Sequence, residues 1–188
     1  MNYTVHLYDP TDNCERRRGY AAEYCSSLID SVIDPATCAA PQYTVYTPVK
    51  SVGDIDAELN RIGGLGGKIG SLLIHSHGAP GRVCIPIKPP TVCLAATNVS
   101  QLKSACRRAM APGATVFFLG CNIGEGPQGE AFLRVAGPHM LGVGGGLMFA
   151  ATSVTLSFPI AGQLLPPWGS TRVAHVSPGG VTFISTIP

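Results

Sequence analysis

The sequence predicts an α/β fold with a mostly parallel central β-sheet, and three observations support this prediction. Apolar runs typical of buried strands alternate along the chain with segments whose apolar residues recur at helical spacing. The 188 residues are 45% hydrophobic and only 13% charged, which is enough apolar material for one sizeable core. No internal repeat or low-complexity linker divides the chain. We therefore expect residues 1–188 to form a single domain, a three-layer sandwich with helices on both faces of the sheet.

The individual elements follow from periodicity and from turn and cap residues. The predicted strands cover residues 3–8, 43–49, 69–77, 114–121 and 146–152, with a hairpin at 82–87 and a terminal hairpin at 171–176 and 180–185. The predicted helices cover residues 21–32, 51–62 and 99–110, and a fourth begins near 131 and is disrupted by the proline at 138. The second helix opens with a capping-box pattern, serine at 51 and aspartate three residues later.

Two of the apolar strands are followed by side chains that can perform chemistry. The strand LLIHSHG is predicted to end at His77, and the strand VFFLGCN at Cys121. Strands alternating with helices predict a parallel sheet, and such sheets bind ligands beyond the carboxyl ends of their strands. If the two strands are neighbours, His77 and Cys121 therefore share one edge.

A cysteine and a histidine at one edge suit nucleophilic catalysis. The thiolate is the attacking form of cysteine, and an imidazole can accept the thiol proton or protonate the leaving amine. Gly78 and Gly120 leave room for the backbone to approach a substrate. We expect the backbone N–H groups of Gly78 and Cys121 to stabilise an oxyanion.

Structural roles compete with these functional ones. Most cysteines in proteins are core residues, but the strand-end position beside glycine favours a nucleophile at Cys121. His75 lies two residues before His77, so in one strand both would face the same side and begin a metal site. Cys84 or Cys93 would have to complete that site, and since the spacing matches no common zinc pattern, we expect a buried His75 and no metal.

Charge, length and cysteine usage narrow the partners and the compartment. The net charge is +2, and the single compact basic run, residues 16–18, has no aromatic residues interleaved, so we expect no nucleic-acid partner. No apolar segment is long enough to cross a membrane. The N-terminus shows no secretory signal, which predicts a cytoplasmic protein or one exported without a recognisable signal. Seven cysteines with no C-x-x-C pair argue against a disulfide framework or zinc ribbon and favour a reducing compartment.

Four short motifs in order support a family resemblance: SHGAPG from Ser76, FLGCN from Phe118, GEAF from Gly129 and AATS from Ala150. The chain resembles the caspase, gingipain and clostripain clan of cysteine peptidases. It is more closely similar to a bacterial domain of large adhesin- and cadherin-like surface proteins, whose pattern is SHG-x-PG, GC-N/D, G-x-x-F and A-A-S/T. The resemblance spans residues 69–155 and implies a caspase-hemoglobinase-like fold with His77 as base and Cys121 as nucleophile.

The chain departs from the clan where substrate specificity is decided. It lacks the basic-glycine continuation of true caspases after Cys121, and no arginine set for binding aspartate can be identified. In relatives that cleave after basic residues, acidic groups lie near the end of the first strand and after the last core strand. Asp9 and Asp12 match the first position, while Thr152 and Ser153 stand at the second.

Three functions from different classes remain open. The first is a cysteine endopeptidase, a hydrolase that cleaves a protein or peptide substrate through a Cys121–His77 dyad and requires no cofactor. The second is a catalytically inactive binding or scaffold module, because a fold does not guarantee activity. The third is a metal-dependent hydrolase using His75 and His77. Neither the cleavage specificity nor the oligomeric state can be inferred from the sequence.

Overall fold

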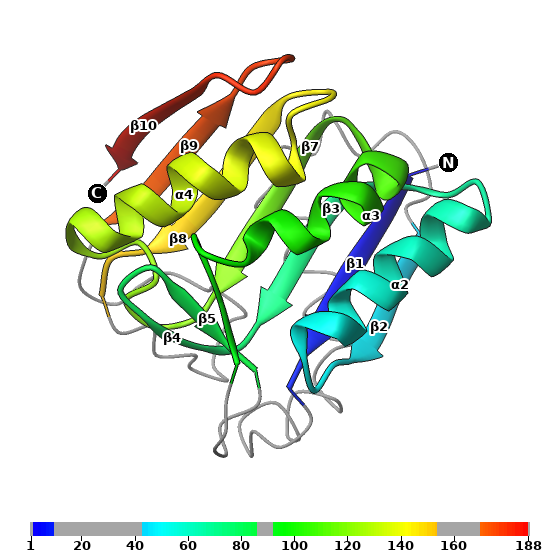
Figure 1. Cartoon of the computed structure of the whole chain (residues 1–188), viewed down its shortest axis with the longest axis horizontal. Coiled ribbons are helices and arrows are strands. Elements are labelled where there is room, and N and C mark those ends of the chain that lie inside the picture. Colours follow the sequence, from blue (N-terminus) through cyan, green and yellow to red (C-terminus); the bar gives the residue numbers. More distant parts are fainter. Residues whose placement is uncertain (1, 10–42, 86–91, 154–169, 188) are drawn as a thin grey trace.

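The computed structural model describes residues 2–9, 43–85, 92–153 and 170–187, which form an α/β fold with a seven-stranded mixed sheet and three α-helices (Figure 1). The strands of this sheet are β1 (Asn2–Tyr8), β2 (Tyr43–Pro48), β3 (Lys68–His75), β7 (Met110–Leu119), β8 (Gly146–Ala151), β9 (Thr171–Val176) and β10 (Thr182–Ile187). The helices are α2 (Val52–Gly64), α3 (Lys103–Ala109), which continues the 3-10 turn η1 (Val99–Leu102), and α4 (Gly126–Met140). A small antiparallel sheet contains β4 (His77–Ala79), β5 (Arg82–Cys84) and β6 (Cys93–Ala95).

The large sheet has the order β10-β9-β8-β7-β3-β1-β2 and is mostly parallel. Five neighbouring strands, β2, β1, β3, β7 and β8, run in one direction. Strands β9 and β10 add an antiparallel hairpin beside β8. The neighbouring strands β3 and β7 pair His75 with Leu119, so they end at the same level. The predicted mostly parallel sheet is therefore confirmed.

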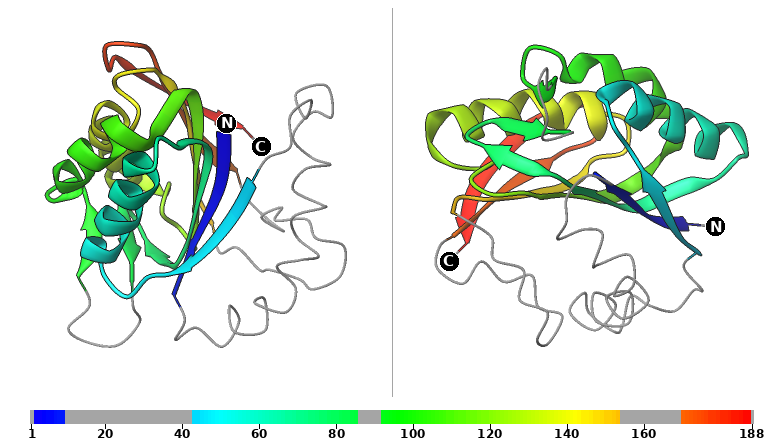
Figure 2. Two further views of the ribbon diagram at one scale, coloured as in Figure 1. Left: turned by 90° about the vertical axis from the view of Figure 1, so that its right-hand side faces the viewer. Right: turned by 90° about the horizontal axis from the view of Figure 1, so that it is seen from below.

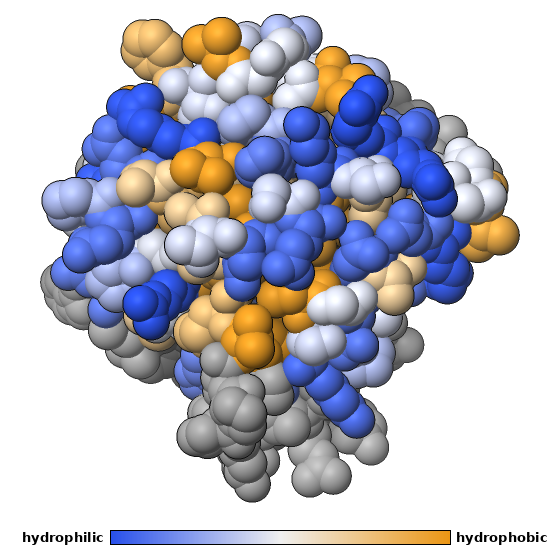
Figure 3. Space-filling model, in the orientation of Figure 1, coloured by the Kyte–Doolittle hydropathy of each residue, from blue (hydrophilic) through white to orange (hydrophobic). Residues whose placement is uncertain are grey.

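The three helices cover one face of the sheet (Figures 1 and 2). Alternate residues of each strand face this layer, because side chains of a strand point to opposite faces in turn. Phe118 of β7, for example, makes an edge contact with Phe132 of α4 at a centroid distance of 5.2 Å. Hydrophilic side chains predominate on the outer surface of the helices (Figure 3), as expected for amphipathic helices. The helix predicted at residues 21–32 lies outside the described residues.

Several element boundaries differ from those predicted. Helix α2 begins as expected, with the Ser51 side chain accepting a hydrogen bond of 3.1 Å from the amide of Asp54. Helix α3 ends at Ala109, and Met110 already belongs to β7. Helix α4 starts at Gly126, five residues before the predicted start, because proline is well suited to the first turn of a helix. Pro138 does not interrupt α4, since it lies in the last turn and removes only one hydrogen bond.

One pair of cysteines forms a disulfide, although the odd number and the spacing of the cysteines argued against a disulfide framework. Cys84 and Cys93 lie directly opposite each other on β5 and β6 and are joined by a disulfide bond, with their Cα atoms 4.1 Å apart. Counting and spacing could not reveal this pair, because a cross-strand disulfide depends on strand register. Cys14, Cys25 and Cys38 lie outside the described residues.

The disulfide gives a stability prediction. Replacing both partners in a Cys84→Ser/Cys93→Ser variant should lower the free energy of unfolding by about 2.5 kcal/mol, because the bond restricts a short loop in the unfolded chain. Urea denaturation measures this difference. A reductant should destabilise the wild type by the same amount and leave the double variant unaffected. Equal stability of the two proteins without reductant would contradict the prediction.

Within the described residues, none of the helices combines the length and the apolar character that a membrane span requires.

Candidate functional site

The carboxyl ends of β3 and β7 bring the two predicted catalytic residues to one edge of the sheet. The strands end at His75 and Leu119, two residues earlier than predicted in each case. Beyond the ends, the amide of Ser76 donates a hydrogen bond of 3.3 Å to the carbonyl oxygen of Leu119. His77 then opens β4, while Cys121 enters the connection to α4.

The backbones at His77 and Cys121 are packed against each other through two glycines. A Cβ atom placed on Gly78 would lie 2.2 Å from the carbonyl oxygen and 3.0 Å from the amide nitrogen of Cys121. A Cβ atom on Gly120 would lie 2.8 Å from the carbonyl oxygen of Ser76 and 3.2 Å from the amide nitrogen of Gly78. Real Cβ atoms do not approach backbone at 2.2 Å, so only glycine permits this contact. The two amides predicted to stabilise an oxyanion thus lie in one small region.

The reactive side chains differ in accessibility. His77 is exposed, and Cys121 is half buried and forms no disulfide. Cys106, the other reduced thiol in the described part of the chain, is fully buried, and burial raises its pKa to about 12. Because the thiolate is the reactive form, Cys106 is inert at neutral pH and Cys121 is the accessible thiol of the described residues.

Residues 121–126, which we call the Cys121 loop, are held by backbone hydrogen bonds on both sides. The amide of Asn122 donates to the carbonyl oxygen of Ser153 (2.9 Å), and that of Gly124 donates to Ala151 (2.8 Å), both just at or beyond the end of β8. On the other side, the amide of Gly81 in the β4–β5 turn donates to the carbonyl oxygen of Ile123 (3.0 Å). These bonds fix the position of the loop between β8 and the small sheet.

Asn122 adopts a left-handed backbone conformation with a φ of 59°, the only such non-glycine residue in the described segments. This conformation is unfavourable for most residues. Glycine adopts it most readily, and asparagine is among the non-glycine residues that tolerate it best. Strained residues of this kind occur preferentially at functional sites, where the surrounding structure enforces them. The outlier directly follows Cys121 and so supports a functional role for this loop.

The small sheet determines the position of His77. In the β4–β5 pair His77 lies opposite Cys84, which is bonded to Cys93 on β6. The disulfide therefore ties together β5, the strand paired with β4, and β6 beyond it. This arrangement restricts movement of both strands beside the imidazole.

The structure does not bring His75 and His77 together as a metal site. His75 is buried at the end of β3, where its Nε2 lies 3.0 Å from Nδ1 of the buried His6. His77 is exposed in a different sheet. Cys84 and Cys93 are bonded to each other in the disulfide, and no group of three potential ligands gathers within the described ranges.

The residues predicted for a substrate pocket are only partly described. Asp9 follows β1 and is fully buried, and its amide donates to the carbonyl oxygen of His75 at 3.4 Å. Asp12 lies outside the described residues. The Thr152 hydroxyl contacts Ser170, donating to its carbonyl oxygen at 2.6 Å. The carbonyl oxygen of Ser153 accepts the hydrogen bond from Asn122, while the Ser153 hydroxyl is buried without a hydrogen bond to any described residue.

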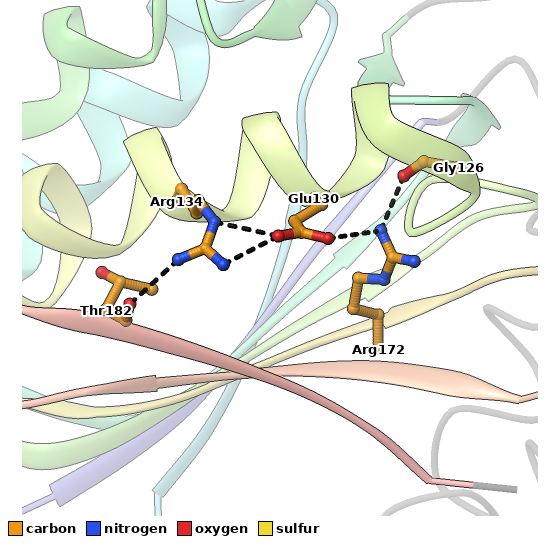
Figure 4. A network of polar contacts seen from close by, with 5 residues as sticks. All are labelled: Gly126, Glu130, Arg134, Arg172 and Thr182. Carbon is orange, nitrogen blue, oxygen red and sulfur yellow. Dashed lines mark hydrogen bonds and ion pairs between the residues drawn. The ribbon is translucent and has the colours of Figure 1, made fainter.

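Arg172 and Glu130, which were not among the predicted site residues, lie beside the end of the Cys121 loop (Figure 4). Arg172 of β9 donates from Nη1 to the carbonyl oxygen of Gly126 at 2.6 Å. Glu130 of α4 forms an ion pair with Arg134 at 2.7 Å and a second one with Arg172 at 3.7 Å. The spacing of four residues between Glu130 and Arg134 is a recognisable helix signal, but no sequence signal connects Arg172 with a residue 46 positions away.

No protein-family model matches this chain, and no curated protein matches it either. The functional assignment therefore depends on the geometry at this edge of the sheet.

Proposed function

We propose that this protein is a cysteine endopeptidase that hydrolyses peptide bonds with Cys121 as nucleophile and His77 as general acid and base. The observation that carries the proposal is the close packing of residues 76 and 78, on either side of His77, against residues 120 and 121 at the carboxyl ends of two adjacent parallel strands. Ligands bind at such ends in parallel sheets. The accessible thiol of Cys121 and the exposed imidazole of His77 belong to the two chain segments that meet at this contact.

The chemistry proceeds in two balanced steps. The Cys121 sulfur attacks the peptide carbonyl carbon, the C–N bond breaks, and the proton taken from the thiol passes through His77 to the leaving amine. This step gives a thioester and a free amine. In the second step His77 accepts a proton from water, the resulting hydroxide attacks the thioester carbonyl carbon, and the C–S bond breaks. His77 returns the proton to the departing sulfur, which restores the thiol and releases the carboxylic acid. No cofactor takes part in either step.

The backbone supplies the electrostatic stabilisation. Negative charge develops on the carbonyl oxygen in each step, and amide N–H groups held in a fixed position stabilise it without reorganisation. Gly78 and Cys121 carry the two amides we assign to this role. Their glycine-dependent contact keeps both within one small region.

The resemblance to the caspase, gingipain and clostripain clan supports the same assignment. As part of the proposal we adopt a caspase-hemoglobinase-like three-layer fold. The mostly parallel sheet, with the histidine and the cysteine after adjacent strands, supports it, while the described helices cover one face of that sheet. The substrate is a protein or peptide. A basic residue before the cleaved bond is favoured only at the first pocket position, by Asp9 and Asp12, because Thr152 and Ser153 provide no carboxylate at the second.

Covalent labelling tests the proposal whatever the natural substrate is. A mixture of peptidyl acyloxymethyl ketones should alkylate Cys121 in the folded wild type, and mass spectrometry of the digested protein identifies the modified residue. His77→Ala should lower the labelling rate at least about tenfold, since the imidazole takes part in the attack. Cys106 should remain unlabelled, because its thiol is buried.

Labelling that bypasses Cys121, or labelling at Cys121 that His77→Ala leaves unchanged, would contradict the peptidase assignment. The first result would favour a binding module that retains the fold. His175→Ala is a matched control, because His175 is exposed on β9, where its ring lies 3.0 Å from the Ser185 hydroxyl and not at the site.

A further inference from the structure

We propose that Arg172 is a positioning residue that holds the Cys121 loop in its active geometry from β9, on the side of helix α4 that faces the sheet. The inference deepens the peptidase proposal and rests on it. Arg172 is four-fifths buried, with its side chain 18% exposed, and it lies on β9 opposite Ala150 near the end of β8. Its side chain extends to the start of α4, where the Cys121 loop ends (Figure 4).

The bond from Arg172 to Gly126 anchors the Cys121 loop through a side chain. The other anchors are backbone bonds at residues 122, 123 and 124. Nη1 of Arg172 donates to the Gly126 carbonyl oxygen at 2.6 Å, and Gly126 has a φ of 59°, which suits glycine. The guanidinium thus holds the point where the loop turns into the helix.

Glu130 places the guanidinium and compensates its charge. Its Oε2 lies 3.7 Å from Nη1 of Arg172, while its Oε1 accepts two hydrogen bonds from Arg134, at 3.0 and 2.7 Å. Arg134 reaches in the opposite direction and donates to the carbonyl oxygen of Thr182 on β10 at 3.4 Å. Arg134 therefore pairs with the same carboxylate as Arg172, but its contacts do not reach the Cys121 loop.

The network is not optimised for stability alone. Nε of Arg172 is buried and makes no hydrogen bond in the part of the chain that the structure describes. A buried donor without a partner lowers stability, so an arginine selected only for stability would be better satisfied. What the Arg172 side chain does achieve is the short bond to the Cys121 loop.

The geometry gives Arg172 a specific kinetic effect. A misplacement of about 1 Å at a catalytic group lowers the rate by about 100-fold, so releasing the loop should reduce the rate of the chemical step. Substrate binding should be little affected, since Arg172 lies under α4 and not at the exposed His77. Arg172→Met removes the donor and retains an aliphatic side chain, while Arg172→Lys retains a charged donor.

The experiment compares these variants with Arg134→Met, which breaks the same ion-pair network without touching the loop. For Arg172→Met we expect kcat to fall about 10- to 100-fold, KM to stay within about twofold, and the amides of Asn122 and Gly124 to exchange hydrogen at least about tenfold faster. Arg172→Lys should recover part of kcat. Arg134→Met should resemble the wild type in all three measurements.

Unchanged exchange and kcat in Arg172→Met, or equal losses in Arg172→Met and Arg134→Met, would overturn the anchor. Arg172→Lys answers the same question through exchange and kcat if Arg172→Met does not fold. Hydrogen exchange does not depend on catalysis, so it tests the anchoring role of Arg172 separately from the peptidase proposal. Wild-type hydrolysis in Cys121→Ala would refute the peptidase proposal, while faster exchange in Arg172→Met would still support the anchor.

Discussion

Cys121→Ala should abolish peptide hydrolysis, with kcat reduced at least about 1,000-fold, because no other described thiol can replace the nucleophile. His77→Ala should cause a loss of similar size. The double variant should be no worse than the poorer single variant, since a nucleophile and its base act as one unit. Cleavage of a mixed peptide library, followed by mass spectrometry, measures these rates for any cleavage specificity.

The matched cysteine control is Cys106→Ala, which removes a thiol that is fully buried in the core. This variant should keep the wild-type rate per folded molecule, although it loses some stability. Circular dichroism of each variant verifies that the fold is intact. Hydrolysis by Cys121→Ala at more than about a tenth of the wild-type rate would rule out the proposed nucleophile, as would additive losses for the two residues.

The sequence predicted the mostly parallel sheet, and the ends of the two strands before the site to within two residues, because burial leaves a strong local signal. The apolar runs before His77 and Cys121 are strands, and these strands are adjacent and parallel. Their common edge follows from that pairing alone. The predicted ends were two residues too long, because the chain leaves the sheet at Ser76 and Gly120, where glycine and short polar residues allow close backbone contact.

The features that the sequence did not reveal depend on register and on distant contacts. The Cys84–Cys93 bond requires two strands to pair in one particular register. His75 and His77 appeared to belong to one strand, but the chain passes from one sheet to another between them. Arg172 contacts the end of the Cys121 loop although it lies 46 residues further along the chain, and nothing local to β9 indicates this.

The contact between Gly78 and Cys121 gives the second prediction with a large effect. In Gly78→Ala the new methyl group would lie 2.2 Å from the Cys121 carbonyl oxygen and 2.5 Å from Cγ1 of Ile123. Relief requires the two chain segments to move apart, because one of the obstacles is backbone. We expect the free energy of unfolding to fall by more than about 3 kcal/mol and the rate of Cys121 alkylation by the acyloxymethyl ketones to fall about 100-fold.

Gly70→Ala provides the matched control on β3, the strand that leads to His77. A Cβ atom on Gly70 would have ordinary contacts, the nearest at 3.4 Å from Asn2, so its stability should change by less than about 1 kcal/mol and its alkylation rate should be unchanged. Urea denaturation and alkylation of the folded fraction separate the two effects. If Gly78→Ala matched Gly70→Ala in both measurements, the backbone contact would not hold His77 and Cys121 in place, and the geometric basis of the proposed dyad would be lost.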